Sequence, residues 1–217
     1  MEYLSEADEL LSLETLKYRE GFCFIAGIDE VGRGPLAGPV VAAAVGFPRG
    51  AQIPRVNDSK QLKAAEREAL DAAIRAVDGV KIGLAELPVE VIDALNILRA
   101  THLAMRRAVE QIPEADCLLV DGLPVPGLPK PSFAFVGGDG RSASIAAASI
   151  VAKVYRDRRM MEYDALYPGY GFAEHKGYGT KAHMEALARL GVSPIHRRSF
   201  TPVRHILEPP PEQLMLF

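Results

Sequence analysis

The chain of 217 residues is 48% hydrophobic and 24% charged, with a net charge of −3, which is ordinary for a globular protein with a substantial core. Its apolar runs are too short for a membrane-spanning helix, and its acidic amino terminus lacks the features of a signal peptide. The two cysteines, Cys23 and Cys117, lie in apolar strand-like runs and predict neither a disulfide framework nor a zinc site. We therefore expect a cytoplasmic monomer built around one main domain.

Along the chain, apolar runs of strand length occur together with longer segments whose hydrophobic residues recur at helical spacing. The strand-like runs are Cys23–Asp29, Val40–Phe47, Val80–Leu87, Asp116–Asp121 and Ser132–Val136. The helical segments are residues 5–19, Ala64–Val77, Asn96–Ile112, Ser142–Tyr163 and residues 180–191. This order predicts an α/β fold in which a mixed β-sheet is flanked by helices.

Two adjacent acids, Asp29 and Glu30, stand at the end of the first predicted strand, directly before a glycine-rich turn. Burying carboxylates there is costly unless a partner or a metal ion compensates. Gly32 and Gly34 allow the backbone to approach a ligand and present N–H groups to it, and Arg33 adds a planar fork suited to phosphate. The stretch predicts metal-assisted chemistry on a phosphate group; a plain turn with solvated acids is the alternative.

The two neighbouring acids pose a geometric problem, because adjacent residues in a strand point to opposite faces of the sheet. Asp29 and Glu30 can serve one site if Glu30 lies beyond the regular strand, where the glycine turn redirects its side chain. We therefore expect the first strand to end at Asp29.

Two further acids occupy comparable places, Asp121 at the end of the fourth predicted strand and Asp139 in a glycine loop before a helix. Strand ends along one sheet edge lie close together, so these acids can converge with Asp29 and Glu30. Clustered carboxylates repel one another unless divalent cations bind between them, and oxygen ligands suit Mg²⁺ or Mn²⁺. Two such ions could hold a phosphodiester and activate water. An ordinary role in a turn is the alternative for Asp121 and Asp139.

Charge is distributed unevenly along the chain. Residues 150–205 carry ten Lys and Arg against five Asp and Glu, whereas the preceding residues are acidic in balance. A basic C-terminal third beside an acidic N-terminal part is consistent with phosphate contacts in one and metal ligands in the other.

Several segments between residues 22 and 204 resemble motifs of type 2 ribonuclease H, the ribonuclease HII family. They are Asp29–Gly34, Asn57–Lys60, Val120–Gly122, Ala146–Val154, Arg156-Asp157, His175–Thr180 and His196–Phe200. The chain departs from the family just before Asp139, where the family often has lysine and this chain has glycine. Asp157 is the competing candidate for that acid, although we prefer an ion pair within its own helix.

The resemblance implies a ribonuclease H-like sheet and an endonuclease that hydrolyses the RNA strand of RNA/DNA duplexes. Single ribonucleotides embedded in DNA would also be cleaved, leaving 3′-hydroxyl and 5′-phosphate ends, as ribonucleotide excision repair and DNA replication require. The catalytic, metal-binding acids would be Asp29, Glu30, Asp121 and Asp139. The substrate-binding residues would be Gly32, Arg33, Gly34, Lys60 and Tyr178. Further phosphate contacts would be Lys176, Arg197 and Arg198. For these three and for Lys60, a solvated surface charge is the alternative.

We expect four parts in the chain: an N-terminal helix over residues 1–21, a catalytic core over 22–170, a helical C-terminal extension over 171–207 and a tail over 208–217. The tail begins with three consecutive prolines, which form a stiff spacer. It ends in Gln213, Leu214, Met215, Leu216 and Phe217. This pentapeptide resembles the motif by which bacterial replication and repair proteins bind the ring-shaped sliding clamp; folding back onto its own core is the alternative.

Two other functions are compatible with parts of this pattern. The first is a catalytically silent protein that binds hybrids, against which the complete acidic set argues. The second is an enzyme acting on a small phosphorylated metabolite, with residues 32–34 as its anion loop. The basic C-terminal third and the tail argue against that second possibility.

Overall fold

The computed structural model describes residues 3–4, 9–56 and 62–208, and a mixed five-stranded sheet forms its centre. The strands are β1 Ile25–Val31, β2 Val40–Gly46, β3 Lys81–Leu87, β4 Cys117–Asp121 and β5 Ser132–Phe135. Their order across the sheet is β3-β2-β1-β4-β5. The first three strands pair antiparallel, whereas β4 runs parallel to β1 and β5 parallel to β4. The central strand β1 therefore has one neighbour of each kind.

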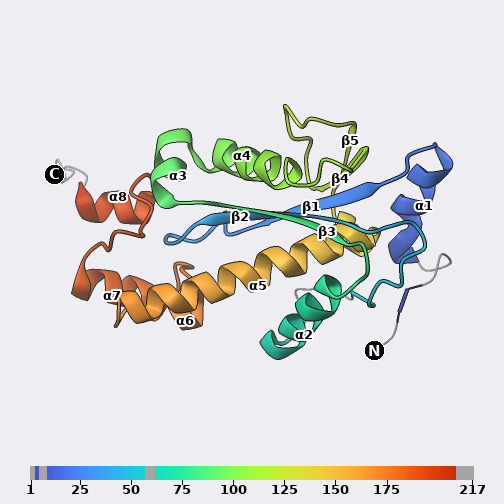
Figure 1. Ribbon diagram of the computed structural model, residues 1–217. Coiled ribbons are helices and arrows are strands. Elements are labelled where there is room, and N and C mark those ends of the chain that lie inside the picture. Colours follow the sequence, from blue (N-terminus) through green and yellow to red (C-terminus); the bar gives the residue numbers. More distant parts are fainter. Residues whose placement is uncertain (1–2, 5–8, 57–61, 209–217) are drawn as a thin grey trace, which may run out of the picture.

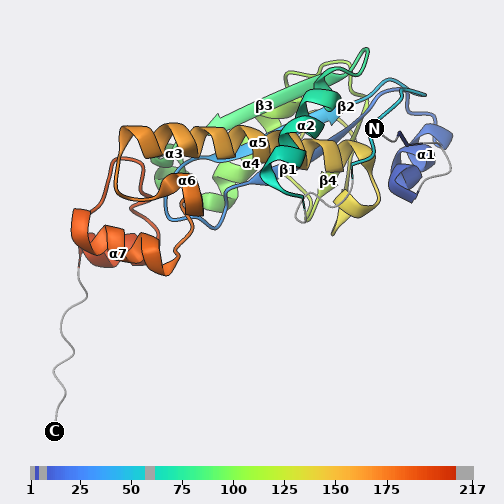
Figure 2. The same cartoon turned by 90° about the horizontal axis from the view of Figure 1, so that it is seen from below.

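Helices cover both faces of this sheet (Figure 1). On one face lie α3 Val89–Leu95 and α4 Ile97–Val109, and on the other lie α2 Ala64–Arg75 and the long α5 Ala143–Leu166. The N-terminal α1 Ser12–Arg19 follows the 3-10 helix η1 Glu9–Leu11, and a second 3-10 helix, η2 Gly138–Gly140, precedes α5. At the opposite end of the molecule from α1 lie α6 Phe172–His175, α7 Lys181–Leu190 and α8 Thr201–Leu207 (Figures 1 and 2).

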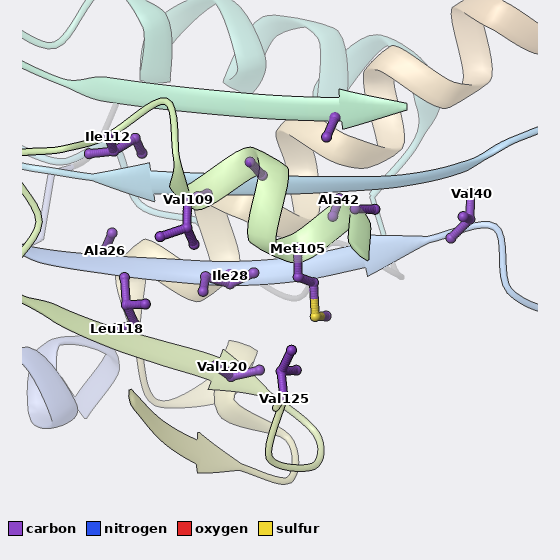
Figure 3. Close-up of a cluster of buried hydrophobic side chains, with 14 of the residues drawn as sticks. Ala26, Ile28, Val40, Ala42, Met105, Val109, Ile112, Leu118, Val120 and Val125 are labelled. Carbon is purple, nitrogen blue, oxygen red and sulfur yellow. The ribbon is translucent and has the colours of Figure 1, made fainter. Parts of the chain in front are cut away.

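The core forms two layers because alternate strand residues point to opposite faces. Ala26 and Ile28 of β1 share one buried cluster with Met105 and Val109 of α4 (Figure 3). On the other face, strand residues of β2 pack with the alanine-rich first half of α5. This second contact is very close: a Cβ atom on Gly27 would lie 2.1 Å from the backbone nitrogen of Ile145. The close contact sets the depth at which the next turns of α5 meet β1.

The N-terminal helix is attached to the start of α5 by a buried carboxylate. One oxygen of Glu14 accepts hydrogen bonds from the backbone N–H of Ser144, at 2.9 Å, and from the hydroxyl groups of Ser142 and Ser144, at 2.7 and 2.6 Å. The positive end of a helix dipole favours an anion at this place. The contact joins α1 to the segment that follows η2.

The predicted α/β fold with a mixed sheet is confirmed, and all five predicted strands are present within two residues of their expected bounds. The predicted helices correspond to α1, α2, α4, α5 and α7; the short helices α3, α6 and α8 were not predicted, since they are too brief for a periodic pattern. The boundaries proposed at residues 21, 170 and 207 stay predictions. None of the helices within the described ranges is long and apolar enough to cross a membrane.

The expected end of the first strand was wrong. β1 continues through Glu30 to Val31, and Asp29, Glu30 and Val31 pair with residues 43, 42 and 41 of β2. The strand continues because its antiparallel partner β2 extends as far as Val40 and supplies hydrogen-bonding partners along this length. Glu30 is therefore a strand residue, and the glycine turn begins after it.

Candidate active site

A cleft of about 490 Å³ opens where β4 ends and β1 continues. The parallel pairing of these strands stops at Ile28 and Val120, so the last residues of β1 have a strand partner only on the β2 side. The residues lining the cleft are Asp29, Glu30, Val31, Gly32, Arg33, Gly34, Arg67, Asp121, Ser149, Lys153 and Tyr178. Because the edge of β1 is open here, side chains from both faces of the strand reach the same space. The two adjacent acids share a cleft without any departure from strand geometry.

Asp29 is the most buried of the acids, with 8% of its surface exposed. It accepts a hydrogen bond from the backbone N–H of Glu30 at 2.7 Å and another from the side chain of Ser149 on α5. Burial, together with the negative charges of Glu30 and Asp121, raises the pKa of Asp29 to about 8. An ionised carboxylate in this position is stable only when a cation offsets its burial and its neighbours.

Glu30 is paired with the arginine of the glycine turn. Its carboxylate lies 3.1 Å from a guanidinium nitrogen of Arg33, whose side chain is half exposed. Burial raises the pKa of Glu30, and the hydrogen bond and charge of Arg33 oppose that rise. Arg33 thus compensates one acid of the cleft, while the donors to Asp29 among the described residues are neutral.

Asp121 connects the cleft to the loop that carries the fourth predicted acid. One of its carboxylate oxygens accepts a hydrogen bond from the backbone N–H of Gly138 at 2.8 Å. Asp139 is the next residue, in η2, and is partly exposed. It stands beside the loop contact of Asp121 and is absent from the wall of the cleft itself.

Tyr178 faces the glycine turn from the opposite side of the cleft. A Cβ atom placed on Gly34 would lie 3.6 Å from ring atom Cε1 of Tyr178, and 46% of the tyrosine surface is exposed. The turn and the tyrosine loop are joined by a hydrogen bond of 2.8 Å from the N–H of Leu36 to the carbonyl of Gly177. The structure therefore brings together residues predicted from segments more than 140 positions apart.

Three polar lining residues were not predicted to have a role: Arg67, Ser149 and Lys153. Ser149 and Lys153 lie one turn apart on α5, within a segment that had been noted only as a family motif. The carboxylate of Asp157 forms ion pairs with both basic side chains, at 2.6 Å from Lys153 and 3.6 Å from Arg67. The preferred interpretation of Asp157 as an ion-pair residue is confirmed, with Lys153 as its partner within the helix. No sequence pattern indicated Arg67, which reaches the cleft from α2.

Other predicted residues lie elsewhere. Lys60 and the tail residues Gln213, Leu214, Leu216 and Phe217 fall outside the described residues. The interpretation of Arg197 as a phosphate contact or a surface charge was wrong: its side chain is fully buried. Its guanidinium donates to backbone carbonyls, as does the amino group of Lys176, which bonds the carbonyl of Ala173.

The donor chemistry of the cleft fits a hard divalent cation. Asp29, Glu30 and Asp121 supply carboxylate oxygens to one space, and such oxygens are the preferred ligands of Mg²⁺ and Mn²⁺. Within the described ranges, no three His, Cys, Asp or Glu side chains are already gathered closely enough to hold an ion. Glu30 is turned to Arg33, as expected for acids that repel one another and have a nearby cation.

Comparison with known proteins points to one family. The family model for ribonuclease HII matches residues 26–203, a range that includes every residue lining the cleft. The chain is 57% identical over 196 residues to a ribonuclease HII from Geobacter sulfurreducens, with 89% of each chain covered. The ribonuclease H2 of Pyrococcus horikoshii OT3 has a similar structure, with a TM-score of 0.70, 27% identity and coverage of 84% of this chain and 96% of that one. A ribonuclease HII from Archaeoglobus fulgidus, solved in complex with PCNA, shares the fold with a TM-score of 0.69, 24% identity and coverage of 82% and 95%.

Proposed function

The chain belongs to the ribonuclease HII family of metal-dependent endoribonucleases, and from this premise we propose that the cleft at the end of β4 is its active site. There it hydrolyses the RNA strand of RNA/DNA duplexes, including single ribonucleotides embedded in DNA. The observation that supports the assignment best is that three carboxylates share one space with the glycine turn and Tyr178. Family membership favours this activity over a silent hybrid-binding protein and over a metabolite enzyme. A substrate within bacterial DNA would be met in the cytoplasm.

Asp29, Glu30 and Asp121 would hold the metal ions, Mg²⁺ or Mn²⁺, and Asp139 would complete the set from η2. When bound, these ions supply a water molecule of lowered pKa and positive charge for the phosphate oxygens. The burial of Asp29 makes it the acid whose ionised form depends most on this charge. The exposed position of Arg33 allows it to exchange Glu30 for a substrate phosphate.

The remaining lining residues bind and orient the scissile strand. Lys153 and Arg67, already held by Asp157, present positive charge to the phosphates, and Lys60 would add to it. The backbone of residues 32–34 and the ring of Tyr178 line a space that a ribose can enter, where the 2′-hydroxyl distinguishes RNA from DNA. Water attacks phosphorus, the bond to the 3′ oxygen breaks and that oxygen takes up a proton. The products are a 3′-hydroxyl and a 5′-phosphate.

The assignment is tested with a DNA duplex that carries one ribonucleotide, incubated with Mg²⁺, with Mn²⁺ or with a chelator. We expect incision beside the ribonucleotide with either ion and none with the chelator. Asp121→Asn should lower the rate by at least about a hundredfold, because it removes a charged metal ligand while keeping the side-chain shape. Glu174→Gln, at an exposed acid that does not line the cleft, is the control. Full activity of Asp121→Asn would refute the proposed site.

We further propose that the tail docks the enzyme on a sliding clamp through Gln213, Leu214, Leu216 and Phe217. The support is the likeness of Gln213–Phe217 to the clamp-binding motif and its position behind a proline spacer.

A further inference from the structure

Two arginines beneath the glycine turn are fully buried, Arg156 on α5 and Arg197 in the loop before α8. Among the described residues neither of them forms an ion pair with a carboxylate. Burying a charge without an opposite charge is costly, so such residues persist only where many hydrogen bonds compensate. Burial lowers the pKa of Arg156 to about 10 and that of Arg197 to about 9, and both stay charged at neutral pH.

The compensating hydrogen bonds all go to backbone carbonyl groups. Arg197 donates to the carbonyls of Gly38 at 3.0 Å and Arg33 at 2.9 Å, and also to those of Gly32 and Pro39. Arg156 donates to the carbonyls of Pro39 at 2.9 Å, Ala37 at 3.1 Å and Lys176 at 3.0 Å. The two guanidinium groups therefore hold both ends of the segment 32–39. Arg156 also ties this segment to the loop that carries Tyr178.

The fit between the arginines and the turn is tight. A Cβ atom on Gly32, where φ is +92°, would lie 2.3 Å from the Nε atom of Arg156. The turn backbone thus lies directly on the guanidinium group, and a side chain at residue 32 would displace it. The planar fork of arginine, with five donors, can meet several carbonyls at once, whereas the single ammonium group of lysine cannot.

These contacts determine where the neighbouring N–H groups point. In a planar trans peptide the carbonyl of one residue and the N–H of the next point in opposite directions. Because Arg197 binds the carbonyls of Gly32 and Arg33, the N–H groups of Arg33 and Gly34 point away from it. Within the described part of the chain neither N–H has an acceptor, and both residues line the cleft.

We propose that Arg197, supported by Arg156, is a positioning residue that aims the N–H groups of Arg33 and Gly34 into the cleft as donors for the 2′-hydroxyl oxygen of the substrate. Arg197 itself does not touch the substrate. This inference rests on the proposed function of the cleft. It deepens that function by assigning ribose selectivity to a buried charge behind the turn.

The inference is tested by Arg197→Lys, which keeps the charge and loses the fork. Its control is Arg204→Lys, at an exposed position of α8. Steady-state kinetics use the duplex with one ribonucleotide as substrate and the all-DNA duplex of the same sequence as a competitive inhibitor. Arg197→Lys should raise KM about tenfold, as expected for two misdirected hydrogen bonds, and leave the inhibition constant of the all-DNA duplex unchanged. An unchanged KM, or a parallel loss of affinity for both duplexes, would overturn the inference.

If the Arg197→Lys variant does not fold, a measurement on the wild-type chain tests whether the turn responds to the ribonucleotide. With ¹⁵N-glycine labelling and a chelator to prevent cleavage, the Gly34 amide resonance should shift when the ribonucleotide-containing duplex is added. It should stay in place with the all-DNA duplex. If wild-type protein incises the ribonucleotide duplex but the Gly34 resonance responds equally to both duplexes, the inference about Arg197 fails and the proposed function stands. If the protein neither binds nor incises that duplex, the proposed function fails and the inference with it.

Discussion

At the scale of single residues, the two glycines of the turn have different reasons to be glycine. Gly32 has a positive φ of +92° and rests against Arg156, so a side chain is excluded by backbone strain and by contact. Gly34 has no positive φ, and an added Cβ would meet only the Tyr178 ring, at 3.6 Å. The fold therefore requires the first glycine, whereas the space in front of the ring requires the second.

This difference predicts that alanine at residue 34 affects substrate binding, whereas alanine at residue 32 affects stability. Gly34→Ala should change the free energy of unfolding by no more than about 0.5 kcal/mol, yet raise KM for the ribonucleotide duplex, because its methyl group enters the space between turn and ring. Gly32→Ala should lower the free energy of unfolding by about 2–3 kcal/mol, because it strains the backbone and displaces Arg156. Urea unfolding and steady-state kinetics on both variants measure the two effects. Unchanged KM in Gly34→Ala would show that this space is not used by the substrate.

At the scale of elements, three histidines join the C-terminal helices. His175 ends α6, His183 lies in α7 and His196 precedes α8; the rings of the first two stack with centroids 4.4 Å apart. The N–H of Ser193 donates to Nδ1 of His196, so the neutral ring carries its proton on Nε2, 3.0 Å from Nε2 of His183. Burial, and then the proximity of His183, lowers the pKa of His196 to about 4. These three histidines connect the C-terminal helices, and no sequence pattern predicted that they converge.

A depressed histidine pKa predicts acid sensitivity. The unfolded chain takes up a proton at the ordinary pKa of 6.5, whereas folded His196 does so only near 4. Stability should therefore be complete above pH 6.5 and fall as the pH decreases toward 4, by on the order of 2–3 kcal/mol. Asp29, whose pKa is raised, contributes the opposite slope, so the useful measurement is a comparison of variants.

Urea unfolding of the wild type and of His196→Gln over this pH range makes that comparison. The variant should lose distinctly less stability on acidification than the wild type. His205→Gln, at an exposed position of α8, should behave as the wild type does. Equal pH slopes in all three proteins would contradict the role assigned to His196.

At the scale of the whole molecule, the lining residues that the structure describes all lie between Asp29 and Tyr178, and they come from the sheet, the glycine turn, α2, α5 and the tyrosine loop. The proposed docking tail begins after α8, which ends at Leu207. Catalysis and clamp docking are therefore expected to be separable functions.

Deletion of residues 213–217 should abolish co-elution with a bacterial sliding clamp and leave cleavage of a short oligonucleotide duplex unchanged. Met215→Ala, at the variable position of the motif, is the control and should keep clamp binding. Co-elution that survives the deletion would rule out the tail as the docking element. Loss of oligonucleotide cleavage would show that the tail also serves the cleft.

The sheet, the longer helices and the acids at strand ends could all be predicted from the amino-acid pattern alone. Apolar runs and helical spacing depend on local periodicity, and a charged residue that ends a buried run is conspicuous without coordinates. The glycine turn and Tyr178 were likewise predicted from the residues and the family resemblance, and the structure places both on the cleft with Asp29, Glu30 and Asp121.

The residues that surround that set depend on packing between distant segments, and local patterns did not reveal them. The bounds of β1 depend on the length of its partner β2, and the entry of Arg67 into the cleft depends on how α2 packs. In the sequence, Arg197 resembled a surface charge. The hydrogen bonds that offset its burial go to backbone carbonyls, which every residue has, so no side-chain pattern indicates them. Periodicity reports which face of an element is buried; the partners of a buried charge follow from packing between segments far apart in the chain.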